Sequence, residues 1–494
     1  MKAMQPTGCT PERGPMPALT RELRLALSIL TLSCVALGAS PRTPASQPPN
    51  IILIVADDLG YGDLGCQGQK RIQTPHIDRL AAEGTRFTQF YAGSTVCAPS
   101  RCALMTGYHM GHARVRGNAG RANPLAQALR PEDLTVARIL QNAGYTTALT
   151  GKWGLGDAGA ADVGLPRRQG FDFFFGYLNQ RHAHNYYPTF LWRNETKVAL
   201  RNIVPNEDPQ GGGVSTNRLD YSPDLILREA LDFIRRTRDR PFFLFFASTL
   251  PHANNEAGKA GMEIPDTGPY AALDWPAPQK GHAAMITRLD RDVRSLLDLL
   301  EELDLDRHTL VFFTSDNGPH REGGNNPEFN DSNGPLRGIK RDLYEGGIRV
   351  PMIVRWPGHV PAGAVNNQPW AFWDLLPTVA QLADAPTPKA IDGISMLPVL
   401  LGQRQHQPHP PFYWEFHEGG FKQAVRLDRW KAVRLAPSRP LELYDLEEDP
   451  GETRDLASTH PTVARKLARL MTRSHRDSPD WPPTAPADVN RSAR

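Results

Sequence analysis

Four short apolar runs, separated by stretches of helical periodicity, constrain the fold of this chain more than any other feature. The runs span residues 51–56, 145–149, 242–247 and 310–314. Segments that are apolar on both faces are typical of strands buried within a parallel sheet. The helical stretches between them span residues 134–143, 223–236 and 283–303. This alternation predicts an α/β fold with a large, mostly parallel central sheet.

Polar residues follow each of these runs. In open α/β sheets, ligands bind at the carboxyl ends of the strands, so polar residues that are far apart in sequence can meet there. Each residue alone has an ordinary explanation as a turn, a cap or a solvated loop residue, but all of them together would require several coincidences. We therefore predict one site formed by Asp57, Asp58, Lys152, His252, Asp316 and Asn317.

The adjacent carboxylates of Asp57 and Asp58 indicate a bound cation. Two carboxylates directly after a buried strand repel each other. The simplest compensation is a hard cation with oxygen ligands, Ca²⁺ or Mg²⁺. A helix cap or a turn pair is the alternative interpretation.

Cys97 directly precedes a stretch of helical character, and Arg101 follows four residues later. Helix-start amides and a nearby arginine both favour negative charge, so Cys97 is a candidate reactive centre. A small buried hydrophobe at a helix start is the alternative. Lys340 lies in a glycine-rich segment and could approach an anion closely, although a solvated loop lysine would have the same sequence.

The first fifty residues differ from the rest of the chain. Arg21 and Arg24 precede an apolar run at 25–37 that is too short to span a bilayer and is followed by small residues. We predict a secretory signal peptide at 1–40 and a linker at 41–49, and hence a periplasmic or secreted protein without stable membrane association. An N-terminal membrane anchor is the alternative.

Cysteine content and net charge narrow the class of protein further. Removal of the signal peptide would leave three of the five cysteines, so at most one disulfide could form. The net charge is only +3 and no long block of lysine or arginine is present, which argues against a nucleic-acid partner. The expected anionic ligand is therefore small.

After about residue 390 the spacing changes to short strands, which predicts a separate C-terminal part. We predict a catalytic domain at 50–390, a subdomain with an antiparallel sheet at 391–475 and a flexible tail at 476–494. A strand at 352–356 and a helix at 373–383 would complete the first domain. The subdomain strands are expected at 412–416, 422–427, 430–434 and 443–446, with a closing helix at 461–472.

The pattern Cys97-Ala98-Pro99-Ser100-Arg101, followed by Leu104-Met105-Thr106-Gly107, resembles the signature of the type I sulfatases. These are arylsulfatase A-like members of the alkaline phosphatase superfamily. Further motifs of that family occur in its order along the chain. They are Ala56-Asp57-Asp58, Thr150-Gly151-Lys152-Trp153, Pro251-His252, Ser315-Asp316-Asn317-Gly318, Lys340 before Tyr344-Glu345-Gly346-Gly347, and Leu443-Tyr444-Asp445-Leu446.

The resemblance implies an alkaline-phosphatase-like sandwich with a smaller C-terminal subdomain. It also implies that a formylglycine-generating maturation enzyme oxidises Cys97 to formylglycine, whose hydrate is the nucleophile. One Ca²⁺ would be held by Asp57, Asp58, Asp316, Asn317 and the group derived from Cys97. Arg101 would stabilise the nucleophile, Lys152 and Lys340 would bind sulfate oxygens, and His252 would meet the oxygen that links sulfur to the leaving alcohol.

One position departs from the family pattern. The family usually has a histidine two residues after the lysine, but here Lys152-Trp153 is followed by Gly154. The missing histidine is thought to help deprotonate the hydrate while sulfate is released. His109 and His112, which we expect on the helix after Cys97, are possible auxiliary bases. Surface or packing roles are the alternative for both.

The substrate is expected to be a sulfated sugar or a fragment of a sulfated polysaccharide. The segment 176–188 concentrates hydrogen-bonding and aromatic groups, which suit a sugar ring, and the stretch 413–418 could form a second wall. The candidate substrate-binding residues are His182, His184, Tyr186 and Tyr187. A loop packed on its own tyrosines is the alternative.

Two other functions remain open at this point. A phosphodiesterase or phosphonate monoester hydrolase of the same superfamily could use a similar pocket, and a non-catalytic sulfoglycan-binding protein could retain the fold.

Overall fold

The computed structural model describes residues 48–118, 123–159 and 161–483, together with Gly8 and Gly14. Nearly all of the predicted signal peptide and linker, and the end of the predicted tail, lie outside the described residues. The residues from Pro48 onward form one compact unit. Within the described residues, no helix has both the length and the apolar character needed to cross a membrane.

The main sheet has eleven strands, and β1 (Asn50–Ala56) lies near its centre. All four apolar runs and the expected strand at 352–356 form strands of this sheet. The order across the sheet is β10 (Ala364–Asn366), β2 (Thr85–Tyr91), β9 (Arg349–Arg355), β8 (Thr309–Ser315), β1, β7 (Phe242–Ala247), β3 (Thr146–Lys152), β4 (Phe173–Tyr177), β5 (Phe190–Arg193) and β6 (Thr196–Ala199), with β11 (Trp370–Ala371) paired to β2.

The five central strands β8, β1, β7, β3 and β4 are parallel to their neighbours in this group. The strand β9 runs antiparallel to both β8 and β2, and β4, β5 and β6 pair antiparallel at the other side. The predicted fold class, a large and mostly parallel sheet, is therefore confirmed. The central strands all direct their carboxyl ends to the same edge of the sheet.

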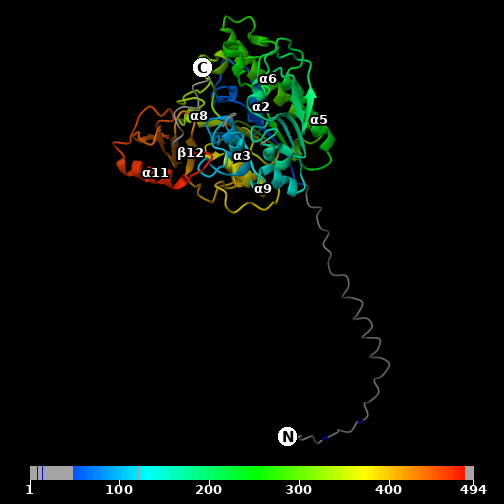
Figure 1. Cartoon of the computed structure of the whole chain (residues 1–494). Helices are drawn as coiled ribbons and strands as arrows, with labels where there is room; N and C mark the ends of the chain where they lie inside the picture. Colours follow the sequence, from blue (N-terminus) through cyan, green and yellow to red (C-terminus); the bar gives the residue numbers. More distant parts are fainter. Residues whose placement is uncertain (1–7, 9–13, 15–47, 119–122, 160, 484–494) are drawn as a thin grey trace, which may run out of the picture. The chain divides into compact units, whose positions relative to one another are not determined.

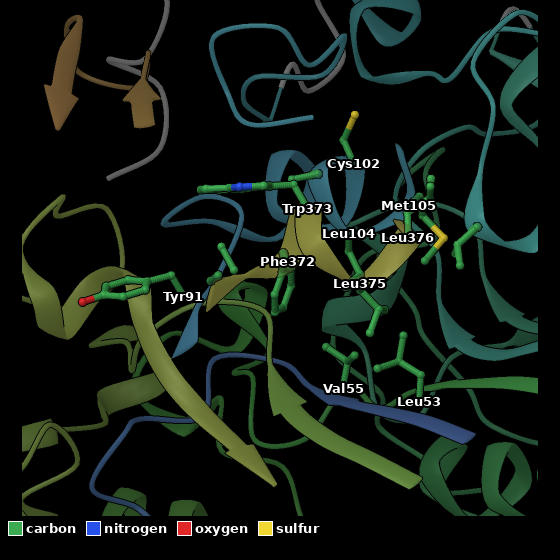
Figure 2. Close-up of a cluster of buried hydrophobic side chains, with 14 of the residues drawn as sticks. Leu53, Val55, Tyr91, Cys102, Leu104, Met105, Phe372, Trp373, Leu375 and Leu376 are labelled. Atoms are coloured by element: carbon green, nitrogen blue, oxygen red, sulfur yellow. The ribbon is translucent and has the colours of Figure 1, made fainter. Parts of the chain in front are cut away.

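Helices cover both faces of this sheet because the residues of β1 are apolar on both sides (Figure 1). Ile52 and Ile54 belong to a core shared with α2 (Pro75–Glu83), α5 (Ser222–Thr237) and α6 (Ala277–Glu302). Leu53 and Val55 belong to the opposite core, shared with α3 (Cys97–Thr106), α4 (Val136–Asn142) and α9 (Leu375–Leu382). Figure 2 shows this second core around β1, α3 and α9.

The helix α3 begins at Cys97 and ends before Gly107. Gly107 has a φ of 75°, in the left-handed region that glycine adopts readily, and its N–H donates to the carbonyl of Ala103 at 3.0 Å. His109 and His112 therefore lie beyond the helix, contrary to the expectation that both stand on it. Cys97 stands at the first residue of α3, and the two histidines follow the opposite end of the helix.

The C-terminal region forms a second, antiparallel sheet whose four strands match the predicted segments closely. Its strands are β12 (Phe412–Phe416), β13 (Lys422–Leu427), β14 (Trp430–Arg434) and β15 (Glu442–Asp445). The helix α11 (Pro461–Ser474) packs on one face through Leu467 and Met471. Trp414 on β12 joins the main core.

The described start of the predicted tail packs against the protein. Trp481 is 8% exposed and belongs to the main core, and its ring lies 5.9 Å from that of His417. Arg116 donates to the carbonyl of Arg476 at 2.7 Å. Residues 476–483 are thus held by specific contacts instead of forming the start of a frayed tail.

The described residues also contain three short helices. These are α7 (Pro327–Asn330), α8 (Glu345–Ile348) and α10 (Leu397–Leu400).

Candidate active site

The carboxyl ends of β1, β3, β7 and β8 bring the six predicted polar residues to one buried edge. Lys152 donates to Oδ2 of Asp57 at 2.6 Å, and the amide of Asn317 donates to Oδ1 of Asp58 at 2.7 Å. Asp316 accepts the backbone N–H of Asp58 at 3.2 Å. Nε2 of His252, after β7, lies 3.5 Å from Oδ2 of Asp58. Residues from four strand ends therefore lie side by side, as the parallel topology predicts.

The oxygen donors at this edge are suited to a hard cation. Asp57, Asp58, Asp316 and Asn317 are fully buried. Oδ1 of Asp57 and Oδ1 of Asn317 have no hydrogen-bond partner among the described residues. Buried carboxylate and amide oxygens without a donor are unfavourable unless they coordinate an ion.

Electrostatics at the site support the same interpretation. Burial alone would raise the pKa of Asp57, but Lys152 and Arg101 hold that pKa below its usual value. Asp316 behaves differently, because burial and the nearby charge of Asp57 raise its pKa to about 7 despite its contact with Arg101. A cation beside these carboxylates would favour the ionised form of all of them. The residues present therefore fit an oxygen-ligated metal ion.

Cys97 lies among these charges at the first residue of α3. It is 3% exposed, and it, Asp57, Asp58 and His252 place potential ligand atoms within 4.8 Å of one another. Burial raises the pKa of the Cys97 thiol to about 12, although Lys152 lowers it in part. The unmodified thiol is therefore neutral near pH 7, which corrects the expectation that the helix start and Arg101 favour a thiolate.

Three cations surround Cys97 and the carboxylates. Arg101 donates from Nε and Nη2 to Oδ2 of Asp316 at 3.0 and 2.8 Å, and from Nη1 to the carbonyl of Lys152 at 2.7 Å. Lys340 donates to Asp58 at 2.8 Å and lies 3.4 Å from Oε2 of Glu322. All three cations are almost completely buried. Each is thus fixed by carboxylates beside the thiol.

His252 contacts Lys340, and its tautomer follows from its partners. Its Nδ1 lies 2.7 Å from the carbonyl of Ala253, which can only accept, so Nδ1 carries the proton. Its Nε2 lies 3.2 Å from Nζ of Lys340 and accepts from that ammonium group. Burial and the charge of Lys340 hold the pKa of His252 well below its usual value. His252 is therefore neutral, with its free nitrogen directed at the cation.

These groups open onto a pocket of about 810 Å³. Cys97, His252 and Lys340 are among its lining residues. The lining also includes Asn118, Gln180, Arg181, Arg341 and Glu418. Sequence reasoning named none of these last five as an individual site residue. Glu418 lies in the stretch 413–418 that was predicted to form a second wall, Gln180 and Arg181 lie within the predicted substrate loop, and Arg341 follows Lys340.

The substrate loop contributes only one of its four candidate residues to the pocket lining. His184 lines the pocket, pairs with Glu256 at 3.1 Å and stacks on His252 with ring centroids 5.0 Å apart. Tyr186 is buried, and its hydroxyl oxygen lies 2.6 Å from the carbonyls of both Thr249 and His252, which share its one proton. These bonds fix the segment that carries His252, so Tyr186 supports the site from behind.

The other two candidates in the loop are also packed inside. His182 is buried, contacts the ring of Phe190 and lies 3.0 Å from the carbonyl of that residue. Tyr187 is 4% exposed, with the guanidinium of Arg218 over its ring. For His182, Tyr186 and Tyr187 the alternative of a packed loop is therefore the better description.

The structure does not bring the two possible auxiliary bases to the pocket. Nδ1 of His112 lies 2.8 and 3.0 Å from the two carboxylate oxygens of Asp392, and its ring stacks on His109 at 4.5 Å. His109 also contacts Tyr413 and Trp373. Both histidines stand beyond the far end of α3 from Cys97, because Gly107 ends the helix there. Their place favours the packing alternative.

The three described cysteines, Cys66, Cys97 and Cys102, are all free thiols. This agrees with the expectation of at most one disulfide, and it leaves Cys97 available for other chemistry.

Comparisons with known proteins agree with this geometry. A family model described as Sulfatase matches residues 49–385, and one described as N-sulphoglucosamine sulphohydrolase, C-terminal, matches residues 339–477. The chain is 34% identical to a steryl-sulfatase of Mus musculus, over 88% of this chain and 83% of that protein. It is 35% identical to an N-acetylgalactosamine-6-sulfatase of Sus scrofa, over 91% of this chain and 89% of that protein.

A solved structure supports the fold independently. The crystal structure of Ps i-CgsB in complex with k-i-k-neocarrahexaose superposes with a TM-score of 0.74 and 29% identity. The match covers 89% of this chain and 96% of that one.

Proposed function

The chain belongs to the sulfatase family and is a sulfuric ester hydrolase, and we propose that it cleaves sulfate from a sulfated sugar through a formylglycine made from Cys97. The observation that carries this proposal is the placement of Cys97. It lies in a pocket beside Lys152, Lys340 and three buried carboxylates. A neutral thiol with a pKa near 12 is a poor nucleophile at pH 7, so the site suits a converted residue better than a free cysteine.

The chemistry of the converted residue explains the surrounding charges. A hydrated aldehyde supplies one hydroxyl that attacks sulfur and a second that allows sulfate to leave. Lys152 and Lys340 stand beside residue 97, where ammonium groups can donate to the nonbridging sulfate oxygens. Arg101 holds Asp316 in place through two hydrogen bonds and also bonds the carbonyl of Lys152. It therefore positions both the Asp316 carboxylate and the backbone that carries Lys152.

We propose that one Ca²⁺ binds at Asp57, Asp58, Asp316 and Asn317, with residue 97 as a further ligand. The all-oxygen donor set and the unpartnered oxygens of Asp57 and Asn317 support a hard cation. A cation there would offset negative charge on the sulfate group.

His252 and Lys340 together can hold a proton at the leaving oxygen. Nε2 of neutral His252 accepts from the Lys340 ammonium, so a proton lies between them. We propose that His252 meets the oxygen that links sulfur to the alcohol, and that this shared proton passes to that oxygen as the S–O bond breaks, so that the alcohol leaves neutral. The effect of His252→Ala on the first step should then grow as the leaving alcohol becomes more basic.

Replacing Cys97 tests the central proposal. Cys97→Ala should abolish turnover of an aryl sulfate, by at least about 10⁴-fold, while circular dichroism and melting temperature stay close to those of the parent chain. Mass spectrometry of the peptide containing residue 97, after co-expression with a formylglycine-generating enzyme, should show formylglycine in the parent chain. Full activity of Cys97→Ala would contradict the proposal.

The substrate proposal rests on His184 and on the relatives. His184 presents a hydrogen-bonding ring to the pocket beside His252, the N-acetylgalactosamine-6-sulfatase is named for an amino sugar, and Ps i-CgsB was crystallised with an oligosaccharide. A steryl-sulfatase is about equally similar, so the family alone does not decide the substrate. Export through a signal peptide would bring the enzyme to extracellular polysaccharides.

Replacing two histidines of the same loop, one at a time, tests whether the loop recognises the substrate or only packs against the protein. His184→Ala should reduce kcat/KM for a sulfated galactose-type oligosaccharide at least about tenfold more than for an aryl sulfate. His182→Ala is the matched control, because the His182 side chain is buried inside the protein. This substitution should lower the melting temperature and reduce kcat/KM for both substrates alike. Equal losses on both substrates for His184→Ala would mean that the loop is only structural.

The two alternative functions lack a specific observation in their favour. The relatives above are named as sulfatases, and the residues expected of a catalytic site are present, including Cys97 and Arg101. Comparing turnover of sulfate and phosphonate esters by the parent chain would distinguish the hydrolase alternative.

A further inference from the structure

Gly154 and Gln180 share one space at the edge of the pocket. Gly154 stands where the family usually has a histidine, and its φ of 83° is one that side chains rarely adopt. A Cβ added at Gly154 would come within 2.3 Å of Nε2 of Gln180. The amide of Gln180 therefore occupies the space into which any side chain at position 154 would project.

The pairing of two parallel strands places this amide beside the catalytic residues. Gly154 follows the end of β3, two residues after Lys152, and donates its N–H to the carbonyl of Leu178 at 3.0 Å. Gln180 follows Leu178 by two residues, after the end of β4. Both Gly154 and Gln180 line the pocket that also contains Cys97.

The amide of Gln180 is buried but not satisfied by the protein. Neither Nε2 nor Oε1 has a hydrogen-bond partner among the described residues, although each atom is almost completely buried. Packing alone gives no reason to place an amide there, because an apolar side chain would fill the space without losing hydrogen bonds to water. An amide whose donor and acceptor are both free, in a pocket built for an anionic group, is suited to bind that group.

We propose that Gln180 is a substrate-binding residue that takes the place of the absent side chain at position 154 and donates from Nε2 to the sulfate group. The proposal rests on the proposed function for the nature of the ligand. A carboxamide can donate to a sulfate oxygen and accept from a hydroxyl, but it cannot act as a base near neutral pH. Gln180 can thus bind sulfate from the space that a side chain at position 154 would fill, but the proton released with sulfate goes to another acceptor.

A double-mutant cycle tests the proposal through binding, independently of turnover. Inorganic sulfate is titrated into the full chain with Ca²⁺ present, and its affinity is measured by calorimetry. Gln180→Ala should weaken sulfate binding about 10- to 100-fold, because it removes a hydrogen bond to a charged group. Gln180→Glu should weaken it further, since a carboxylate would repel the anion.

Gly154→Ala tests whether a side chain at position 154 competes with the Gln180 amide for the same space. Its added Cβ must displace the amide, so it should weaken sulfate binding about as much as Gln180→Ala does. In the Gln180→Ala background the same change should have little further effect on affinity, because no amide is left to displace. Any loss of stability from the φ of residue 154 should occur in both backgrounds and can be read separately from melting temperatures.

The outcomes separate this proposal from the proposed function. Gln403→Ala makes the same chemical change at an exposed position and should leave sulfate affinity unchanged. A Gln180→Ala variant that binds sulfate within twofold of the parent chain would overturn the role of Gln180, whether or not the enzyme is active. If the parent chain binds sulfate in a Gln180-dependent way but does not turn over aryl sulfates, the proposed function fails and the role of Gln180 stands. A parent chain that does not bind sulfate would contradict both.

Discussion

Two of the buried charge clusters among the described residues differ in how completely their members satisfy one another. At the catalytic edge, oxygens of Asp57 and Asn317 lack donors within the described chain. The second cluster joins the two sheets around Lys431 and Glu345. There both carboxylates lie beside the ammonium group of Lys431, although Oε1 of Glu452, 2.9 Å from its Nζ, makes no well-aligned hydrogen bond among the described residues.

The second cluster shows what a purely structural arrangement looks like. Lys431 is fully buried on β14 and lies 2.9 Å from Glu345 and 2.9 Å from Glu452. Glu345 also accepts from the hydroxyl of Tyr91 at 2.7 Å and lies 3.3 Å from Arg349. The comparison teaches that burial of charge does not by itself identify a functional site. At the catalytic edge, the additional evidence is that metal-ligand oxygens without partners lie next to residues that line a pocket.

The largest effect is expected from removing a ligand at the unsatisfied cluster. Asp316→Ala should lose both bound Ca²⁺ and turnover, by about 10³-fold or more, because it removes a metal ligand and leaves Arg101 without its carboxylate. Metal content by elemental analysis and aryl-sulfate kinetics measure the two losses. Two stoichiometric zinc ions in the parent chain would instead favour a phosphatase-like hydrolase.

The matching change at the satisfied cluster should affect folding and leave the chemistry alone. Lys431→Met leaves Glu345 and Glu452 buried without their shared cation, which should lower the free energy of unfolding by about 3–5 kcal/mol. Chemical denaturation measures this loss, and Lys466→Met on exposed α11 is the control. Folded Lys431→Met should keep nearly the kcat of the parent chain. If Lys431→Met instead lowered kcat strongly without changing the free energy of unfolding, the cluster around Lys431 would have a catalytic role and the contrast between the two clusters would be wrong.

Glu452 gives the satisfied cluster a pH dependence of predictable sign. Burial raises its pKa from 4.5 to about 7, despite the neighbouring charge of Lys431. Between these two pH values the carboxyl group is protonated in the folded protein and ionised in the unfolded chain. Its contribution therefore stabilises the protein below about pH 4.5 and is lost as pH rises through about 7.

Glu452→Gln should remove this dependence. Between pH 8 and pH 5 the parent chain should gain at most about 3 kcal/mol of unfolding free energy from Glu452, and the variant should show a correspondingly flatter curve. Denaturation at several pH values measures the difference. Identical curves for the parent chain and the variant would show that Glu452 does not titrate in this range.

The arrangement of the fold was largely predictable because its strands are apolar on both faces. β7 and the three strands β12, β13 and β14 have the predicted bounds. α5 is one residue longer at each end than the predicted helix, whereas α6 begins six residues before its predicted start and ends one residue before its predicted end. The strand β2 was not foreseen, since its buried and half-buried residues alternate irregularly around a bulge between Phe87 and Phe90. The antiparallel direction of β9 also has no local sequence signal, because direction depends on how the chain returns to the sheet.

The predictable part of the site is the part attached to strand ends. Asp57 and Asp316 directly follow parallel strands and Lys152 is the last residue of another, so topology alone brings them together. Residues on loops were harder, because composition does not tell which side of a loop faces the pocket. This is why Tyr186 was expected in the pocket and is instead buried behind it, while Gln180 was overlooked.

The smallest effect is expected at His112, where closeness in sequence to Cys97 is misleading. Its ring pairs with Asp392 and stacks on His109, and its side chain is 24% exposed. His112→Ala should therefore change kcat/KM by less than about twofold and lower stability by about 1 kcal/mol, the usual cost of one partly exposed hydrogen bond. His109→Ala should lose more stability, because its ring is buried against Tyr413.

Stopped-flow kinetics with an aryl sulfate should show no burst in either variant, since a burst requires that release of sulfate has become slower than release of the alcohol. A burst followed by stalled turnover would mean that one of these histidines does serve as the base that Gly154 lacks, and the site would then extend well beyond the unsatisfied cluster at the sheet edge.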